Sequence, residues 1–207
     1  EMCKDGMMEN FKIDEVYGMH NWPGVELGKF AIRSGPFFAA SDFIEATILG
    51  KGGHAAKPHE TVDPTVIASQ IVVALQTIAS RRADPVEQVV VSITSFETSS
   101  TAFNVIPQEV KIKGTVRTLD PDVRDLAEKE FLRITELTAE AMGGSADAKF
   151  TRGYPVMSNS SEQTEFAAKV ARDVAGECAE APLVMGGEDF AYMLEERPGA
   201  YILLGNG

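Results

Sequence analysis

The sequence has few cysteines, few histidines and little positive charge. Its 207 residues include two cysteines, three histidines and one tryptophan. Cys3 and Cys178 have no CxxC spacing and cannot form a disulfide framework, which favours a reducing, cytoplasmic location. Only 19 Lys and Arg stand against 31 Asp and Glu, so the net charge is −12, and no stretch gathers a basic cluster. We therefore expect neither a nucleic-acid partner nor an anionic membrane surface as partner.

Long hydrophobic runs are also missing. The longest apolar stretch, residues 66–75, is interrupted by Ser69 and Gln70 and is too short to span a bilayer. A hydrophobic fraction of 44% and a charged fraction of 24% are typical of a globular protein. No signal-peptide pattern is visible. The chain begins inside an expected helix over residues 1–4, which Gly6 ends, and it finishes directly after an expected strand over residues 200–204. These ends predict a fragment of a longer chain.

The middle of the chain alternates between strand and helix patterns. Apolar residues at every second position predict half-buried strands, and Asp63-Pro64 and Asp120-Pro121 predict helix starts, the first helix running about five turns. The expected strands cover residues 42–49, 88–96, 109–119 and 146–154, and the second helix ends at Gly143-Gly144. The order β-α-β-β-α-β predicts an α+β ferredoxin-like domain, residues 41–155, with both helices on one face of an antiparallel sheet.

The segments on either side of this domain have a different pattern. Residues 16–19 and 200–204 are short continuous apolar runs typical of buried parallel strands. Residues 161–175 and 189–196 have helical periodicity. We infer part of an α/β domain, residues 1–40 and 156–207, which the ferredoxin-like domain interrupts.

His20 is a candidate metal ligand. It follows a strand-like apolar run, in Gly18-Met19-His20-Asn21-Trp22-Pro23. An imidazole at the carboxyl end of a strand in an open α/β sheet points into the crevice where such folds hold ligands. The alternative is a packed histidine with a structural role.

His54 is a second candidate, because Gly52, Gly53, Ala55 and Ala56 around it are too small to bury its ring. A histidine on such a turn can donate a hydrogen bond to a developing oxyanion, although a flexible surface loop remains the alternative.

Asn104 and Arg117 are candidates for holding a carboxylate. Asn104 precedes the third strand of the ferredoxin-like domain and Arg117 lies on that strand's polar face. A guanidinium with an amide donor suits the free carboxylate of an amino acid, while a turn asparagine and a solvated basic face are the alternative. The adjacent carboxylates in Gly186-Gly187-Glu188-Asp189-Phe190 are interpreted as acids favoured by the dipole of the following helix.

Five motifs in order resemble the amidohydrolase branch of the aminoacylase and carboxypeptidase metallopeptidases, which includes hippurate hydrolase and the indole-acetyl-amino-acid hydrolases. They are the runs that begin at Gly18, Gly50, Phe103, Gly114 and Gly186. The resemblance implies a catalytic α/β domain with two divalent metal ions (Zn, Mn, Co or Ni) and an inserted lid domain that makes the homodimer. It also implies that His20 is a metal ligand, that His54 reaches the partner subunit's active site, and that Asn104 and Arg117 bind the substrate's carboxylate.

The sequence departs from the family pattern in its remaining ligands. The family's Cys-Gly-His motif, its paired glutamates and its last histidine ligand are absent, and Cys3 lies in a different context. We therefore expect metal-dependent hydrolysis of the amide bond of N-acyl amino acids in the parent protein, and an incomplete site in this fragment. The alternatives are a non-catalytic dimerising or ligand-binding ferredoxin-like module, and a dipeptidase or deacetylase of the same superfamily.

Overall fold

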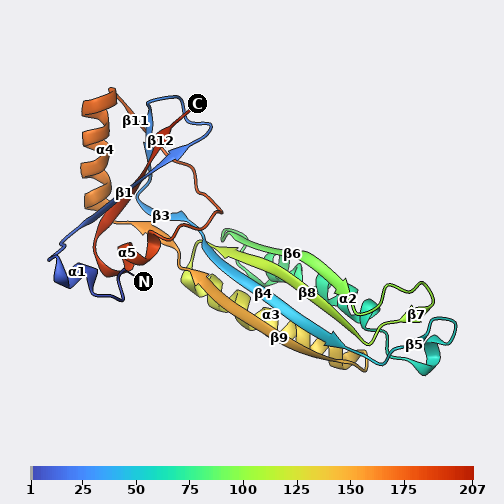
Figure 1. Cartoon of the computed structure of the whole chain (residues 1–207). Helices are drawn as coiled ribbons and strands as arrows, with labels where there is room; N and C mark the ends of the chain where they lie inside the picture. The colour runs from blue at the N-terminus through green and yellow to red at the C-terminus, as the bar shows by residue number, and fades with distance from the viewer. Residues whose placement is uncertain (1) are drawn as a thin grey trace. The chain divides into compact units, whose positions relative to one another are not determined.

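The computed structural model describes residues 2–207 and divides the chain into two compact units. One unit comprises the described residues up to Ala40 together with Tyr154–Gly207, and the other comprises Ser41–Gly153 (Figure 1). The second unit is therefore inserted into the sequence of the first.

The inserted unit contains a four-stranded sheet and two helices. Its elements are β4 (Ala40–Leu49), α2 (Pro64–Leu75), β6 (Val89–Thr98), β8 (Glu109–Thr118), α3 (Pro121–Ala141) and β9 (Ser145–Tyr154). The strand order is β6-β8-β4-β9, and β6 pairs antiparallel with β8. This order, with a helix between β4 and β6 and another between β8 and β9, is that of a split βαβ unit. The element order agrees with the pattern of the sequence.

One apolar core joins both helices to one face of this sheet. The strands contribute alternate residues to this core: Ile44, Ala46 and Ile48 on β4, and Val110, Ile112 and Val116 on β8. The helices contribute Ile67, Ile71 and Leu75 of α2, and Ala127, Phe131 and Ile134 of α3. The residues between them on the strands, such as Lys111 and Lys113, face outward and are exposed. The period of two in the sequence therefore separates a covered face from an open one.

Both predicted Asp-Pro helix starts are confirmed. The Asp63 carboxylate accepts a hydrogen bond from the Thr65 N–H at 2.8 Å, and Asp120 accepts from the N–H groups of Asp122 and Val123. The first helix is shorter than the expected five turns, because α2 ends at Leu75 and the chain continues as a π-helical turn, Ile78–Arg82. At this break the Thr77 hydroxyl donates to the Ala74 carbonyl, a side-chain bond that competes with helix hydrogen bonds.

The other unit contains a mixed sheet in the order β1-β12-β2-β11. The strands are β1 (Val16–Trp22), β2 (Phe30–Ile32), β11 (Cys178–Glu180) and β12 (Gly199–Gly205). Strands β1 and β12 pair in parallel, as their apolar runs predicted, whereas β2 pairs antiparallel with β12. The unit also has a small sheet of β3 (Gly35–Phe38) and β10 (Met157–Asn159), and helices α1 (Met7–Asn10), α4 (Ser161–Ala175) and α5 (Ala191–Glu196).

Two expectations for this unit are corrected. Residues 2–6 form turns and α1 starts after Gly6, whose φ of 78° is left-handed, so Gly6 begins a helix instead of ending one; Glu1 lies outside the described residues. Helix α5 starts at Ala191, two residues later than expected. Among residues 2–207, strand β1 is the edge strand of this sheet, with Tyr17 and Met19 44% and 59% exposed.

Two short strands complete the inserted unit. Strand β5 (Gly53–His54) pairs antiparallel with β7 (Val105–Ile106), and a 3₁₀ turn, Pro58–Glu60, follows β5. In Figure 1 they lie beyond the end of the sheet at which β4 finishes and β8 begins. Among residues 2–207 no helix has the length and apolarity needed to cross a membrane.

Candidate functional site

His20 lies near the carboxyl end of β1, in register with Leu203 of β12. Its ring is half-buried and lies edge-on to the Trp22 ring at a centroid distance of 5.6 Å. The Nδ1 atom is 2.5 Å from the Asn21 carbonyl oxygen, which can only accept, so Nδ1 carries the proton and donates. In the neutral ring the Nε2 atom then has a free lone pair.

This tautomer fits a metal ligand. A ligating histidine usually donates its other ring N–H to a carboxylate or a backbone carbonyl, which fixes the ring and directs the free nitrogen to the metal. His20 has such an arrangement with Asn21. Among residues 2–207, however, no group of three or more His, Cys, Asp or Glu side chains could hold a metal ion. His20 can thus supply one ligand of a metal site, and the described residues do not complete that site.

Gly18 allows two aromatic rings to approach β1 on the face that carries His20. A Cβ atom on Gly18 would lie 2.5 Å from the Tyr201 ring and 3.1 Å from the Phe190 ring. The Tyr201 hydroxyl donates to the Glu188 carboxylate at 2.8 Å. Burial, together with this carboxylate, raises the pKa of Tyr201 well above its usual value. Glu188 lies before α5 and not in its first turn, so the helix-dipole interpretation does not describe it. Its carboxylate instead binds the hydroxyl of a buried tyrosine.

His54 and Asn104 lie side by side at the β5–β7 pair. His54 is in register with Val105, and the Ala55 N–H donates to the Asn104 carbonyl at 3.0 Å. Both side chains are exposed. The glycines before His54 are needed for this pairing, because a Cβ on Gly52 would lie 2.8 Å from the Ile106 carbonyl oxygen. Residues 53–54 and 103–106 thus form a compact tip that presents both candidates.

The His54 ring has the opposite tautomer to that of His20. Its Nδ1 atom is 3.1 Å from the Ala56 backbone nitrogen, an N–H that can only donate. Nδ1 therefore accepts, and the proton of the neutral ring is on Nε2. An exposed imidazole held in this way presents an N–H donor to its surroundings, which is the group that an oxyanion requires.

Arg117 is at the other end of the inserted unit. It lies near the end of β8, in register with Val90 of β6 and half-buried. Eight residues of extended strand, about 26 Å at 3.3 Å per residue, separate it from Glu109, where β8 begins beside the tip. Among the residues that the structure describes, the Arg117 guanidinium has no hydrogen bond or ion pair. One copy of the chain therefore brings His54 and Asn104 together but does not bring Arg117 to them.

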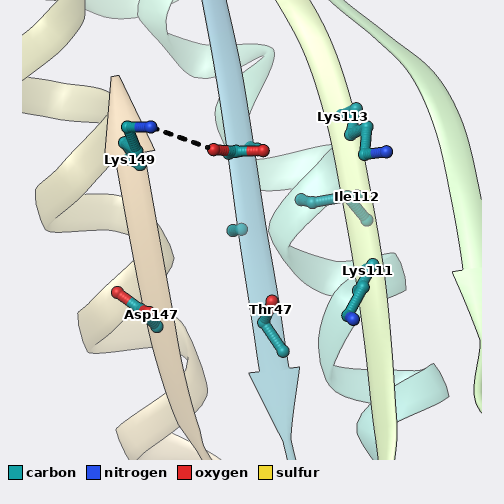
Figure 2. Close-up of a pocket in the computed structure, with 8 residues that line it drawn as sticks. Thr47, Lys111, Ile112, Lys113, Asp147 and Lys149 are labelled. Atoms are coloured by element: carbon teal, nitrogen blue, oxygen red, sulfur yellow. Dashed lines mark ion pairs between the residues drawn. The ribbon is translucent and has the colours of Figure 1, made fainter. Parts of the chain in front are cut away.

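The open face of the inserted sheet has a shallow polar groove of about 380 Å³ (Figure 2). It is lined by Glu45, Ala46, Thr47, Lys111, Ile112, Lys113, Asp147 and Lys149. The Lys149 ammonium lies 3.5 Å from the Glu45 carboxylate. Charges of both signs alternate on an exposed sheet, so this groove has the character of a solvated face. None of the predicted site residues lines it.

Comparison with known proteins identifies the family. The family model of peptidase family M20/M25/M40 matches residues 1–207. The chain is 37% identical over 205 residues to an N-acetyl-L-cysteine deacetylase of Bacillus subtilis, covering 99% of the chain and 49% of the relative. It is 38% identical over 211 residues to a hippurate hydrolase of Campylobacter jejuni, covering 99% of the chain and 54% of the relative.

A solved structure has the same fold. The Bacillus subtilis YXEP protein, described as a dinuclear metal binding peptidase from the M20 family, superposes with a TM-score of 0.80 at 29% identity, covering 99% of this chain and 51% of that one. The chain spans about half the length of the curated relatives it matches. Because the family match extends over all 207 residues, the chain belongs to peptidase family M20/M25/M40, as its five motifs predicted.

Proposed function

We propose that the complete gene product containing this chain hydrolyses the amide bond of N-acyl amino acids. The observation that carries the proposal is the pair of opposite imidazole tautomers: His20 keeps a free Nε2 lone pair, and His54 presents an Nε2–H donor. Hydrolysis of an amide at a metal centre can use both groups, one to bind the metal and one to donate to the charged oxygen of the tetrahedral intermediate. A non-catalytic module would require neither.

His20 would be one protein ligand of a divalent-metal site. The further ligands that such a site requires would come from polypeptide outside residues 1–207. The chemistry supplied at a site of this kind is polarisation of the scissile carbonyl and activation of water near neutral pH. The Asn21 carbonyl holds Nδ1 of the His20 ring, which leaves Nε2 as the nitrogen that can bind a metal.

Asn104 and Arg117 would bind the substrate's free carboxylate from two different subunits. Within one chain they are at opposite ends of β8, about 26 Å of strand apart. They can meet on one substrate only if the tip of one copy reaches the Arg117 of another. His54 lies beside Asn104 and would enter the partner's site with it, with its Nε2–H directed at the oxyanion. This supports a homodimer in which the inserted unit acts as a shared lid.

A substrate panel and metal exchange test the function. Purified gene product supplied with Zn²⁺ or Mn²⁺ should hydrolyse N-acetyl and N-benzoyl amino acids. Removal of the metal with a chelator should abolish turnover, and adding the metal back should restore it. Absence of hydrolysis for every acyl amino acid in a protein that binds metal would contradict the proposal and favour a binding module. Cleavage of free dipeptides in preference to acyl amino acids would favour a dipeptidase.

Replacing Arg117 tests the carboxylate contact. We expect Arg117→Leu to lower kcat/KM for N-acyl amino acids about 30-fold, because a hydrogen bond to a charged group contributes about 2 kcal/mol. The corresponding N-acyl amino acid amides, which have no carboxylate, should lose little. Lys113→Leu is the matched control, because Lys113 is a cation on the outward face of the same strand. Equal losses on acids and amides would remove the carboxylate contact from the mechanism.

A further inference from the structure

Phe103 is exposed at the tip that carries His54 and Asn104. Of the large apolar side chains in residues 2–207 it is the most exposed, with a relative exposure of 108%. It directly precedes Asn104 and is followed on the same tip by the exposed Val105. The fold of the inserted unit therefore does not use the Phe103 ring, although a phenylalanine favours burial.

The loop that carries Phe103 is held by its own hydrogen bonds. The Thr98 hydroxyl donates to the Ser100 carbonyl at 2.7 Å, and the Ala102 N–H donates to the Ser100 hydroxyl at 3.2 Å. The Ser99 hydroxyl accepts from the N–H groups of Gln108 and Glu109, both at 3.3 Å. These bonds support the loop on both sides of the ring, so Phe103 projects from an ordered turn.

The Gln108 side chain connects this loop to the segment between β4 and β5 that leads to His54. Its amide nitrogen donates to the Gly50 carbonyl at 2.7 Å, and its amide oxygen accepts from the Gly52 N–H at 3.1 Å. Together with the bond between Ala55 and Asn104, these contacts place Phe103, Asn104 and His54 on one structural support. Wherever His54 and Asn104 act, Phe103 accompanies them.

We propose that Phe103 forms an apolar wall of the partner subunit's site and selects N-acyl amino acids with apolar side chains. This inference rests on the proposed function. Asn104 would contact the substrate's carboxylate, and the amino acid side chain is attached to the carbon next to that carboxylate. Phe103 and Val105 flank Asn104, and Phe103 has the larger and more exposed side chain of the two, so its ring is the group that can reach the substrate's side chain. A desolvated phenyl ring there favours leucine or phenylalanine over glycine, which offers no side chain to contact.

Relative rates on two substrates test this role in the complete gene product. The ratio of kcat/KM for N-acetyl-L-leucine to that for N-acetylglycine should fall about tenfold in Phe103→Ala, within the range of discrimination by one apolar pocket contact. The rate on N-acetylglycine should stay within about threefold of wild type. Phe103→Leu, which keeps an apolar side chain, should restore most of the ratio. Phe43→Ala is the matched control, because Phe43 is an exposed ring of the same unit on β4.

The outcomes separate this inference from the function on which it depends. If the wild type is active and Phe103→Ala has the same substrate ratio as the wild type, the role of Phe103 is overturned and the proposed function is unaffected. An equal loss on both substrates with weaker dimerisation in sedimentation also overturns it, because Phe103 would then be an interface residue only. A wild type that hydrolyses neither substrate, although it binds metal, contradicts the proposed function and the inference with it.

Discussion

His54→Ala should lower kcat for N-acyl amino acid hydrolysis by about 100- to 1000-fold, the usual cost of removing one oxyanion donor. The reason is the tautomer: the Ala56 N–H occupies Nδ1, so the Nε2–H of the exposed ring is the donor left free. An alanine provides no donor in its place. KM should change little, because the charged oxygen develops in the transition state and not in the bound substrate. Steady-state kinetics on the complete gene product measure both constants.

Two comparisons make the result specific to His54. His59 is also exposed, in the turn after β5, and its imidazole lies 3.8 Å from the Glu60 carboxylate. His59→Ala should therefore retain activity. Because His54 is exposed, its replacement should change the free energy of unfolding by no more than about 0.5 kcal/mol. A His54→Ala variant with wild-type kcat would show that the tip does not take part in catalysis.

Arg124→Leu should lower the free energy of unfolding of the inserted unit by about 3–5 kcal/mol, the usual cost of leaving a buried charge without its partner. Asp42 is fully buried and Arg124 is 9% exposed. The guanidinium donates to both carboxylate oxygens, from Nε at 2.9 Å and from Nη2 at 2.5 Å. Asp42 also accepts from the Gly153 N–H at 3.0 Å. The pair thus joins α3 to the start of β4 and the end of β9. These are the two places at which the chain passes from one unit to the other.

Chemical denaturation measures this effect against a second arginine. Arg152 donates to Asp125 and Glu128 on the surface, so Arg152→Leu should cost less than about 1 kcal/mol. Combining Arg124→Leu with Asp42→Asn should recover part of the loss, because the asparagine is neutral and still accepts from Gly153. A loss below about 1 kcal/mol for Arg124→Leu alone would mean that water reaches the Asp42 carboxylate.

Long elements with local start signals could be predicted from the sequence. Strand β8 has clean alternation, and α3 and α4 have helical periodicity with clear ends. Strands β2, β3, β10 and β11 have three or four residues each, too few for a period to appear. Their pairing is also non-local, since β2 lies between β12 and β11 from the far end of the chain. Such strands depend on tertiary contacts, which no local pattern contains.

The sequence indicates which residues are candidates for the site but not how they are arranged. His20, His54, Asn104 and Arg117 are recognisable by motif, but the two tautomers depend on single backbone groups of Asn21 and Ala56. The separation of Asn104 from Arg117 depends on the length and direction of β8, and the sequence pattern alone does not give this distance. The sequence around Glu188 indicates a helix and the sequence around Tyr201 indicates a buried strand. Neither pattern indicates the hydrogen bond between their side chains. The assignment of these residues to catalysis and binding stays a prediction.

The most direct test of the account is whether two inactive variants complement each other. His20→Ala chains and His54→Ala chains of the complete gene product would be mixed, and subunits allowed to exchange. Each mixed dimer would contain one site with both histidines intact, so random exchange in a twofold dimer should restore about a quarter of wild-type activity. If mass spectrometry shows that subunits have exchanged and activity still does not return, the result contradicts a site that takes His54 from the partner subunit.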